Sequence, residues 1–159
     1  MTPTTPPAGF AELFERHYEA VFRSALRVTG NPADAEDVLQ TVFLRLLARG
    51  EAAGDGELPA AYFKRAAVNA AVDVLRRREL RAESTYEDRE HPVETPLLLK
   101  ERLRRAIAVL DSEDASLFLL RFVEGLSNEE LAVTFQLEKN NVAVRLHRIR
   151  HRLQMEMQR

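Results

Sequence analysis

Cysteine and tryptophan are both absent from the 159 residues of this chain. Without cysteine the protein can form no disulfide, carry no thiol nucleophile and build no cysteine-ligated metal site. No apolar run approaches the length that spans a bilayer, and the opening residues, MTPTTPPAGF, lack the basic and apolar parts of a secretion signal. These absences predict a cytoplasmic protein that has no membrane segment of its own.

The chain also lacks an excess of charge of either sign, because its formal net charge is only -2 at pH 7. The charges are nevertheless unevenly distributed. Basic side chains dominate residues 139–159 and gather a second time at residues 76–81, whereas residues 83–94 between them are acidic. Local basic patches of this kind can bind nucleic acid even when the total charge of a protein is close to neutral.

The first part of the sequence predicts two amphipathic helices joined by a short turn. Apolar residues recur at helical spacing over residues 10–29, and Gly30 is a natural C-terminal stop. Asn31 and Pro32 then supply an N-cap and a first-turn proline. A second helix is therefore expected to run from this point to about residue 49.

Further along the chain, residues 50–59 contain three glycines and are expected to form a loop, and residues 59–80 a third helix. Residues 81–96 are acidic and have no helical period, which predicts a linker. Two more helices should follow, the second of which stops at Gly125. Their apolar stripes are Leu99, Leu103, Ala106, Ile107 and Leu110 in the first, and Leu117, Leu120 and Val123 in the second.

The predicted fold class is all-α, because no segment has the apolar and polar alternation of a strand. We expect two small helical domains joined by an acidic linker, with a helix-turn-helix in the C-terminal domain. The expected division is a disordered tail over residues 1–9, a helical domain over 10–80, the linker over 81–96 and a second helical domain over 97–159.

Residues 125–153 have the pattern of a helix-turn-helix, in which a short helix and a tight turn precede a longer basic helix. Ser127 and Glu130 have the spacing of a capping box. The second helix has an apolar stripe at Val142, Leu146, Ile149 and Leu153. Its opposite face is expected to carry Asn141, Val144, Arg145, Arg148 and Arg152. Such a helix either enters a DNA groove or is a solvated basic helix, and this segment alone does not separate the two.

Three stretches and the order in which they follow one another indicate a known family. They are residues 31–47, NPADAEDVLQTVFLRLL; residues 61–78, AYFKRAAVNAAVDVLRRR; and residues 118–153, which contain the helix-turn-helix. Together they resemble the extracytoplasmic-function (ECF) sigma factors, the compact promoter-specificity subunits of bacterial RNA polymerase. The resemblance implies a docking helix for the polymerase clamp, a promoter-melting segment and a reader of the upstream promoter element, respectively. It therefore implies two partners, core RNA polymerase and promoter DNA, the DNA both as a duplex and as a melted non-template strand.

The start of the second predicted helix is acidic, and its residues Asp37 and Gln40 match the family's contacts to a basic coiled coil in the polymerase. Acidic residues at a helix N-terminus also stabilise the helix dipole, which accounts for part of the pattern. Thr41 stands where the family usually has an acidic residue. This departure either weakens docking or places a phosphorylatable hydroxyl where charge is wanted. By resemblance, Asp37, Gln40 and Thr41 are the polymerase-binding residues.

In the third predicted helix, Asn69 has the donor and acceptor needed to read an exposed base edge. The resemblance assigns it to the unpaired non-template strand at the minus-ten element, and the alternative is an amide satisfied by a neighbouring helix. Tyr62 takes a position usually held by tryptophan, where it either stacks on a melted strand or packs half-buried. The residues assigned to phosphates are Lys64, Arg65, Arg76 and Arg77.

The resemblance places the beginning of the last helix at the minus-thirty-five element. The base-facing positions are Asn141, Val144, His147 and Arg148, and Arg145 is assigned to a phosphate. Asparagine and arginine have bidentate partners in the major groove, on adenine and guanine respectively. Ala143 replaces a basic residue that is common in the family, so the promoter sequence stays open.

The acidic linker and the partners of relatives add two more expectations. In relatives this linker threads the basic active cleft and RNA exit path of the polymerase, although an ordinary solvated linker would have the same composition. Relatives are also held closed or bound by an anti-sigma factor until a signal arrives. The resemblance therefore implies an anti-sigma factor as a further partner of this chain.

Three other interpretations compete with this one. A free-standing helix-turn-helix regulator would explain residues 127–153 but not the acidic docking helix. An enzyme is disfavoured because His147 and His151, although four apart on a helix, have no HExxH pattern or acidic ligand nearby, and no nucleophile elbow or Walker-type loop occurs. We therefore expect no catalysis, no cofactor and no metal. An inactive or decoy family member is the third alternative, because of Thr41, Tyr62 and Ala143.

Overall fold

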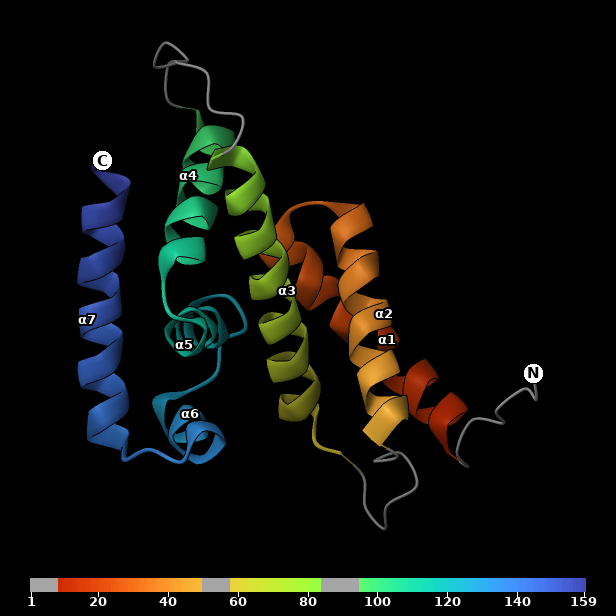
Figure 1. Cartoon of the computed structure of the whole chain (residues 1–159). Helices are drawn as coiled ribbons and strands as arrows, with labels where there is room; N and C mark the ends of the chain where they lie inside the picture. The colour runs from red at the N-terminus through yellow and green to blue at the C-terminus, as the bar shows by residue number, and fades with distance from the viewer. Residues whose placement is uncertain (1–8, 50–57, 84–94) are drawn as a thin grey trace. The chain divides into compact units, whose positions relative to one another are not determined.

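The computed structural model describes residues 9–49, 58–83 and 95–159 (Figure 1). Within these ranges the chain forms seven α-helices and no strand, which confirms the predicted all-α class. The expected tail, apart from Gly9, lies outside the described residues, as do most of the glycine-rich loop and most of the linker.

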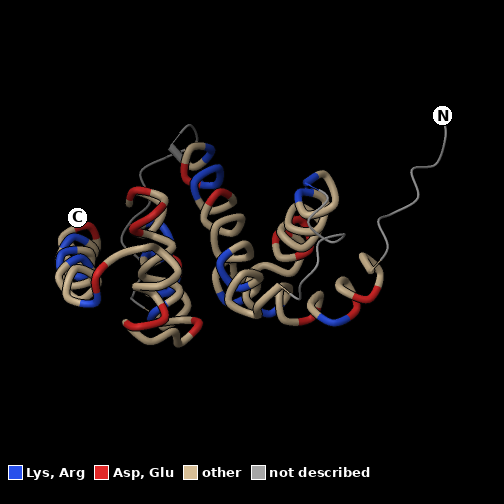
Figure 2. The backbone as a smooth tube through the Cα atoms, turned by 90° about the horizontal axis from the view of Figure 1, so that it is seen from below, with Lys and Arg blue, Asp and Glu red and all other residues tan. Residues whose placement is uncertain are grey.

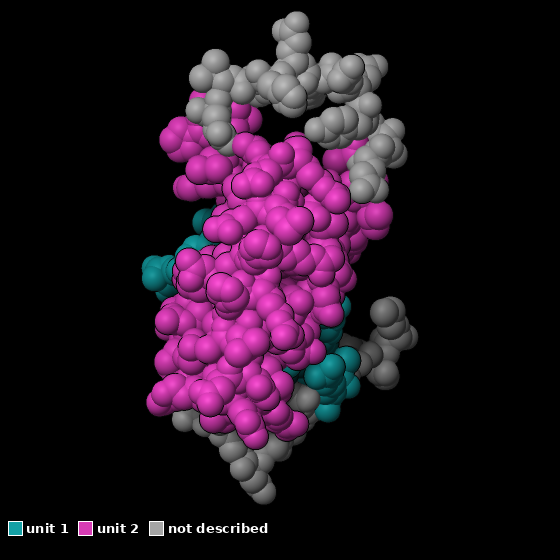
Figure 3. Space-filling model, turned by 90° about the vertical axis from the view of Figure 1, so that its left-hand side faces the viewer, with its two compact units in different colours: residues 1–71 teal, residues 72–159 magenta. Residues whose placement is uncertain are grey.

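The helices group into two compact units, residues 1–71 and residues 72–159, which Figure 3 colours separately. The boundary falls inside the third helix. The elements, in chain order, are α1 (Phe10–Thr29), α2 (Pro32–Arg49), α3 (Ala60–Glu83), α4 (Pro96–Val109), α5 (Ser112–Phe122), α6 (Asn128–Phe135) and α7 (Lys139–Met157).

The turn between α1 and α2 forms as the sequence predicts. Gly30 adopts a left-handed conformation with φ of 65°, and its N–H donates to the carbonyl of Leu26. Asn31 Oδ1 then accepts from the backbone N–H groups of Ala33 and Asp34 at 2.9 Å and 3.2 Å, which satisfies two donors at the start of α2. This tight connection makes α1 and α2 neighbours in the first unit (Figure 1).

Two aromatic rings join the mainly aliphatic core of the first unit. Phe43 of α2 is buried, and its ring meets the ring of Phe14 edge-on at a centroid distance of 4.9 Å. Phe63, from the first half of α3, is also buried and stacks on the ring of His17 at 3.9 Å. Burial of side chains of this size stabilises the fold by about 1.5–3 kcal/mol each.

In the second unit, α7 packs against α4, α5 and α6 through one apolar stripe. The predicted stripe is confirmed, because all four of its residues are buried: Val142, Leu146, Ile149 and Leu153. At the far end of α7, Arg102 of α4 donates from Nη2 to the carbonyl of Met157, one of the terminal carbonyls that lack a partner within the helix. The helix α7 is thus anchored by its buried stripe and, near its C-terminus, by the hydrogen bond from Arg102.

Three element details differ from the sequence-based expectation. The helix α5 ends at Phe122 and not at Gly125. The N–H of Glu124 donates to the carbonyl of Leu119, five residues back instead of the four of an α-helix, so the backbone departs from the helix before Gly125. The helix α3 continues three residues past its predicted end, to Glu83. Leu99 is 46% exposed, because the run of three leucines that begins at residue 97 does not by itself define which one faces inward.

Candidate nucleic-acid interface

The helix-turn-helix is built from α6, a tight turn and α7. The predicted capping box is confirmed, because Ser127 Oγ accepts from the N–H of Glu130 at 3.1 Å and Glu130 Oε1 accepts from the N–H of Ser127 at 3.4 Å. Gln136 closes α6 in a left-handed conformation with φ of 55°. The N–H of Leu137 then donates to the carbonyl of Ala132, which starts the turn into α7.

An ion pair bridges the two helices across this turn. Lys139 Nζ, in the first turn of α7, lies 2.8 Å from Glu129 Oε1 of α6. The hydrogen bond and the positive charge of Lys139 lower the pKa of the Glu129 carboxyl. Both side chains are well exposed, so the pair contributes orientation more than stability.

Of the five residues expected opposite the buried stripe of α7, only Val144 is opposite; the other four, one asparagine and three arginines, lie beside the stripe, which corrects the expectation from the sequence. Each of the residues in this set immediately precedes a buried residue, and one position is about 100° around a helix. The set, which we call the basic flank, is Asn141, Arg145, Arg148 and Arg152. Figure 2 shows how lysine and arginine recur along α7. Because the flank adjoins the packed side of the helix, its side chains stay within reach of α5.

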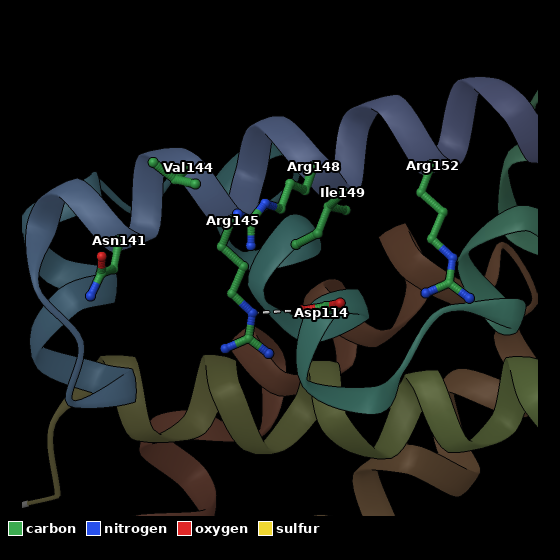
Figure 4. Close-up of a pocket in the computed structure, with 7 residues that line it drawn as sticks. All are labelled: Asp114, Asn141, Val144, Arg145, Arg148, Ile149 and Arg152. Atoms are coloured by element: carbon green, nitrogen blue, oxygen red, sulfur yellow. Dashed lines mark hydrogen bonds and ion pairs between the residues drawn. The ribbon is translucent and has the colours of Figure 1, made fainter.

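The basic flank lines an open hollow of about 510 Å³ in the second unit (Figure 4). Val144, Ile149 and Asp114 complete its lining. Four of the five residues predicted to meet the minus-thirty-five element therefore share one concave surface: Asn141, Val144, Arg145 and Arg148. The fifth, His147, is exposed but lies outside this lining.

Arg145 is held inside the second unit by two carboxylates of α5. Its Nε donates to Asp114 Oδ1 at 2.6 Å, and its Nη1 donates to Glu113 Oε1 at 3.1 Å. Partial burial of the guanidinium lowers its pKa, but the hydrogen bonds and charges of Asp114 and Glu113 outweigh this effect and raise the pKa overall. Arg145 was predicted as a phosphate contact, and the structure adds an acidic partner to it.

Sequence reasoning missed Asp114 and Glu113. They are separated from Arg145 by 31 and 32 residues, and their only local signature is that acidic side chains are common in the first turn of a helix. Only the packing of α5 against α7 brings the three side chains together.

The residues predicted for the minus-ten element lie along α3. Asn69 is exposed although its neighbours Val68 and Ala70 are buried, so its amide is presented at the surface of the helix. Tyr62 is half-buried, and its ring meets the ring of Phe63 edge-on at 5.3 Å. The basic residues of this set differ in exposure: Lys64 and Arg65 are half-buried, as is Arg76, and Arg77 is exposed.

Arg76 makes hydrogen bonds within the second unit. Its Nη2 donates to the carbonyl of Leu110 at 2.5 Å, and its Nη1 donates to Ser112 Oγ at 2.6 Å. Leu110 lies in the connection between α4 and α5, and Ser112 is the first residue of α5. The guanidinium of Arg76 therefore ties the second half of α3 to this connection, whereas the neighbouring Arg77 projects into solvent.

The residues predicted to dock on the polymerase lie on one side of α2. Asp37 and Gln40 are exposed, and Thr41 is half-buried. Their exposed neighbour Glu36 adds a further carboxylate to the surface of the same helix. Since Val38 and Val42 are buried, the core side of α2 is separate from this acidic side.

The described part of the chain contains neither a cluster of metal-binding side chains nor a helix able to span a membrane. Over residues 9–49, 58–83 and 95–159 no group of three or more histidine, aspartate or glutamate side chains is placed to hold a metal ion. Among the helices that the structure describes, none combines the length and the apolar character needed to cross a membrane.

Comparison with known proteins gives two family matches that together cover most of the chain. The model for Sigma-70 region 2 matches residues 13–81, and the model for Sigma-70 region 4 matches residues 100–153. The first match contains α2 and most of α3, and the second contains α6 and most of α7. A solved structure of the sigma factor RpoE in complex with the anti-sigma factor NepR, from Bartonella quintana, is similar in fold, with a TM-score of 0.54 at 19% identity over 94% of this chain and 96% of that chain.

Curated relatives match over nearly the whole sequence. The RNA polymerase sigma-E factor of Streptomyces coelicolor is 31% identical over 151 residues, which cover 93% of this chain and 85% of the relative. The ECF RNA polymerase sigma factor SigL of Mycobacterium tuberculosis is 30% identical over 154 residues, which cover 92% of this chain and 87% of the relative. The similarity therefore extends through both matched regions, and the chain belongs to the ECF sigma factors of RNA polymerase.

Proposed function

We propose that this protein binds core RNA polymerase and directs it to a set of promoters, where it recognises the DNA and helps to open it. The observation that carries this proposal is the helix-turn-helix of the second unit, in which a fully buried stripe on α7 adjoins a basic flank whose members are exposed except for the partly buried Arg145. A helix anchored in this way can enter the major groove with fixed orientation. Membership of the ECF sigma factors supports the link from DNA recognition to transcription initiation.

The upstream element is the proposed target of the hollow on α7. Asn141 and Arg148 have side chains that read adenine and guanine, and Val144 offers an apolar contact for a thymine methyl group. Arg145 is proposed to contact a phosphate while it remains paired with Asp114. His147, which is exposed outside the hollow, is kept as a fifth candidate contact at the edge of the same helix.

The melted strand at the downstream element is the proposed target of α3. Asn69 presents its amide at the surface and is proposed to read an unpaired base. Tyr62 offers a ring for stacking. The phosphate contacts are proposed to come from Lys64, Arg65, Arg76 and Arg77, of which Arg76 is already hydrogen-bonded to Leu110 and Ser112.

Docking on the polymerase is proposed for the acidic side of α2. Asp37 and Gln40 are exposed three positions apart, and the half-buried Thr41 adjoins them. A negative surface of this kind complements a basic partner and speeds its capture. The protein is proposed to make and break no covalent bonds itself, since the polymerase would supply the catalysis. Its place of action is then the cytoplasm, where bacterial polymerase and DNA are found.

An anti-sigma factor is the regulatory partner that we propose. The support is membership of the family, together with the complex of RpoE and NepR, although that complex describes the other protein. The expectation is that affinity capture with the tagged chain recovers a protein that suppresses its transcriptional activity. Recovery of core polymerase alone, from cells grown under several stresses, would argue against such a partner.

Run-off transcription tests the central proposal. Purified core polymerase is given a library of promoter fragments, with and without this protein. Protein-dependent transcripts that share a two-part motif support the sigma function and reveal the specificity. If no transcript appears but the protein still binds polymerase, it is an inactive or decoy member of the family. If it binds DNA but not polymerase, it is a free-standing regulator.

A further inference from the structure

An acidic residue lies in the middle of the surface that is proposed to bind DNA. Asp114 lines the same hollow as Asn141, Arg148 and Arg152, and its carboxylate is bonded to Arg145 (Figure 4). A carboxylate so close to the path of a DNA phosphate repels it, so its presence calls for a physical reason. A contribution to stability does not by itself explain the presence of Asp114, because partly exposed ion pairs add little to the free energy of folding.

The geometry of the contact provides that reason. The side chains of Asp114 and Arg145 are 22% and 30% exposed, whereas that of Glu113 is 50% exposed. Asp114 is therefore the better shielded of the two acidic partners, and its contact with Nε is also the shorter, at 2.6 Å against 3.1 Å. Asp114 holds the guanidinium at Nε, and Glu113 adds a second contact, at Nη1, from a more exposed position.

The free side of the guanidinium remains usable. Arginine has five N–H donors in a rigid fork, and the two contacts with α5 involve Nε and Nη1. Within the residues that the structure describes, Nη2 donates no hydrogen bond to the protein. A guanidinium held along one edge can still donate from the other, and it loses less conformational entropy on binding because it is already ordered.

We propose that Asp114 is a specificity-determining positioning residue for the upstream promoter element. It holds Arg145 in the orientation needed at the correct sequence, and by pairing with the charge of Arg145 it weakens the attraction of that side chain to the phosphates of unrelated DNA. This inference rests on the proposed function, because it assumes that α7 reads the upstream element. Asp114 acts through Arg145 and does not itself contact a base.

The test uses holoenzyme assembled from core polymerase and the full chain. Initiation rates are measured on a promoter found by the run-off library and on the same promoter with a scrambled upstream element, at several salt concentrations. Asp114→Asn keeps the shape of the side chain but removes its charge. We expect the ratio of the two rates to fall about five- to tenfold, within the range that one good contact provides. The fall should come mainly from faster initiation on the scrambled promoter, with a steeper salt dependence there, since a released Arg145 can neutralise one more phosphate.

Control variants separate positioning from a general effect of charge or stability. Glu156→Gln removes a negative charge from the last turns of α7, outside the hollow, and should leave the ratio unchanged. In an Arg145→Ala background, Asp114→Asn should have no further effect, because Asp114 then has nothing to position. Thermal unfolding of each variant shows whether it is folded. Asp114→Glu, which keeps the charge, should restore much of the discrimination.

Two results would overturn the inference, and a third would overturn its premise. If Asp114→Asn is folded and discriminates like the wild type, Asp114 does not determine specificity. If it lowers the ratio equally with and without Arg145, it acts by itself. If the wild-type holoenzyme initiates equally on both promoters, upstream recognition itself has failed, which refutes the proposed function and not only the role of Asp114.

Discussion

Arg145 and Asp114 meet at 2.6 Å across the packed boundary between α7 and α5, so that a predicted DNA contact is already paired with a carboxylate of its own unit. This changes how the surface of α7 is understood. The basic flank is a mixed surface, in which Arg148 and Arg152 are exposed cations and Arg145 is partly neutralised. Under the proposal made for Asp114, a mixed surface of this kind limits binding to unrelated DNA and leaves more of the affinity to the matching sequence.

The first prediction concerns Arg148, which is exposed and lines the hollow. Arg148→Ala should reduce discrimination at one position of the upstream element by about 1–3 kcal/mol, because it removes a side chain able to bond a guanine at two points. The measurement is initiation on promoters with single base changes in that element. Arg150→Ala is the matched control, since Arg150 also has an exposed side chain on α7 but lies over the ring of Phe122. Equal discrimination by wild type and Arg148→Ala would remove Arg148 from the readout.

The second prediction concerns the docking surface on α2. Asp37→Arg should abolish binding to core polymerase without unfolding the protein, because Asp37 is exposed and its charge would become repulsive toward a basic partner. Binding is measured by pull-down, and folding by circular dichroism. The control is Glu15→Arg, the same reversal of charge at an exposed position of α1 and not of α2. A folded Asp37→Arg protein that supports normal transcription would refute this docking assignment.

The helices and their boundaries were largely predictable from sequence because their signals are local. Gly30 and Asn31 specify the turn between α1 and α2 by backbone conformation and by capping, both of which act within a few residues. The capping box of Ser127 and Glu130 is local in the same sense. Where no local signal distinguished the alternatives, as in the leucines before Lys100, the inward residue was not predictable.

The partners of the arginines were not predictable, because they come from distant parts of the chain. Arg145 finds Asp114 across 31 residues, and Arg76 finds the carbonyl of Leu110 across 34. An arginine in a predicted basic patch looks the same in the sequence whether it is solvated or paired. Candidate DNA-facing residues could therefore be predicted from the sequence. How much of their charge is left for binding DNA depends on tertiary packing, which the sequence pattern does not reveal.

The third prediction compares two adjacent arginines of α3. Arg76→Ala removes two hydrogen bonds, one to the connection between α4 and α5 and one to the first residue of α5, and should lower the unfolding free energy by about 1–3 kcal/mol. Arg77→Ala removes an exposed side chain and should change that free energy by less than about 0.5 kcal/mol. Denaturant unfolding of the two variants measures the difference.

The same pair of variants also addresses their predicted contacts with DNA. If both arginines bind phosphates in the open promoter, formation of the open promoter should depend less steeply on salt concentration with each variant than with the wild type. A variant that alters stability but leaves the salt dependence unchanged would show that its arginine is structural. That outcome is compatible with the hydrogen bonds of Arg76 but would contradict the assignment of Arg77, for which no such role is seen.

The fourth prediction concerns the entrance to the helix-turn-helix, where Gly125 has a left-handed backbone with φ of 76°. A β-carbon added there would meet no atom within 4 Å, so a substitution is opposed by backbone strain and not by crowding. Gly125→Ala should therefore destabilise the second unit by about 1–2 kcal/mol. Gly125→Asn should cost less, because asparagine adopts this conformation more readily than alanine although its side chain is larger. Denaturant unfolding of both variants provides the measurement. If asparagine is the more damaging of the two, the side chain is hindered after all, and strain at Gly125 is the wrong explanation.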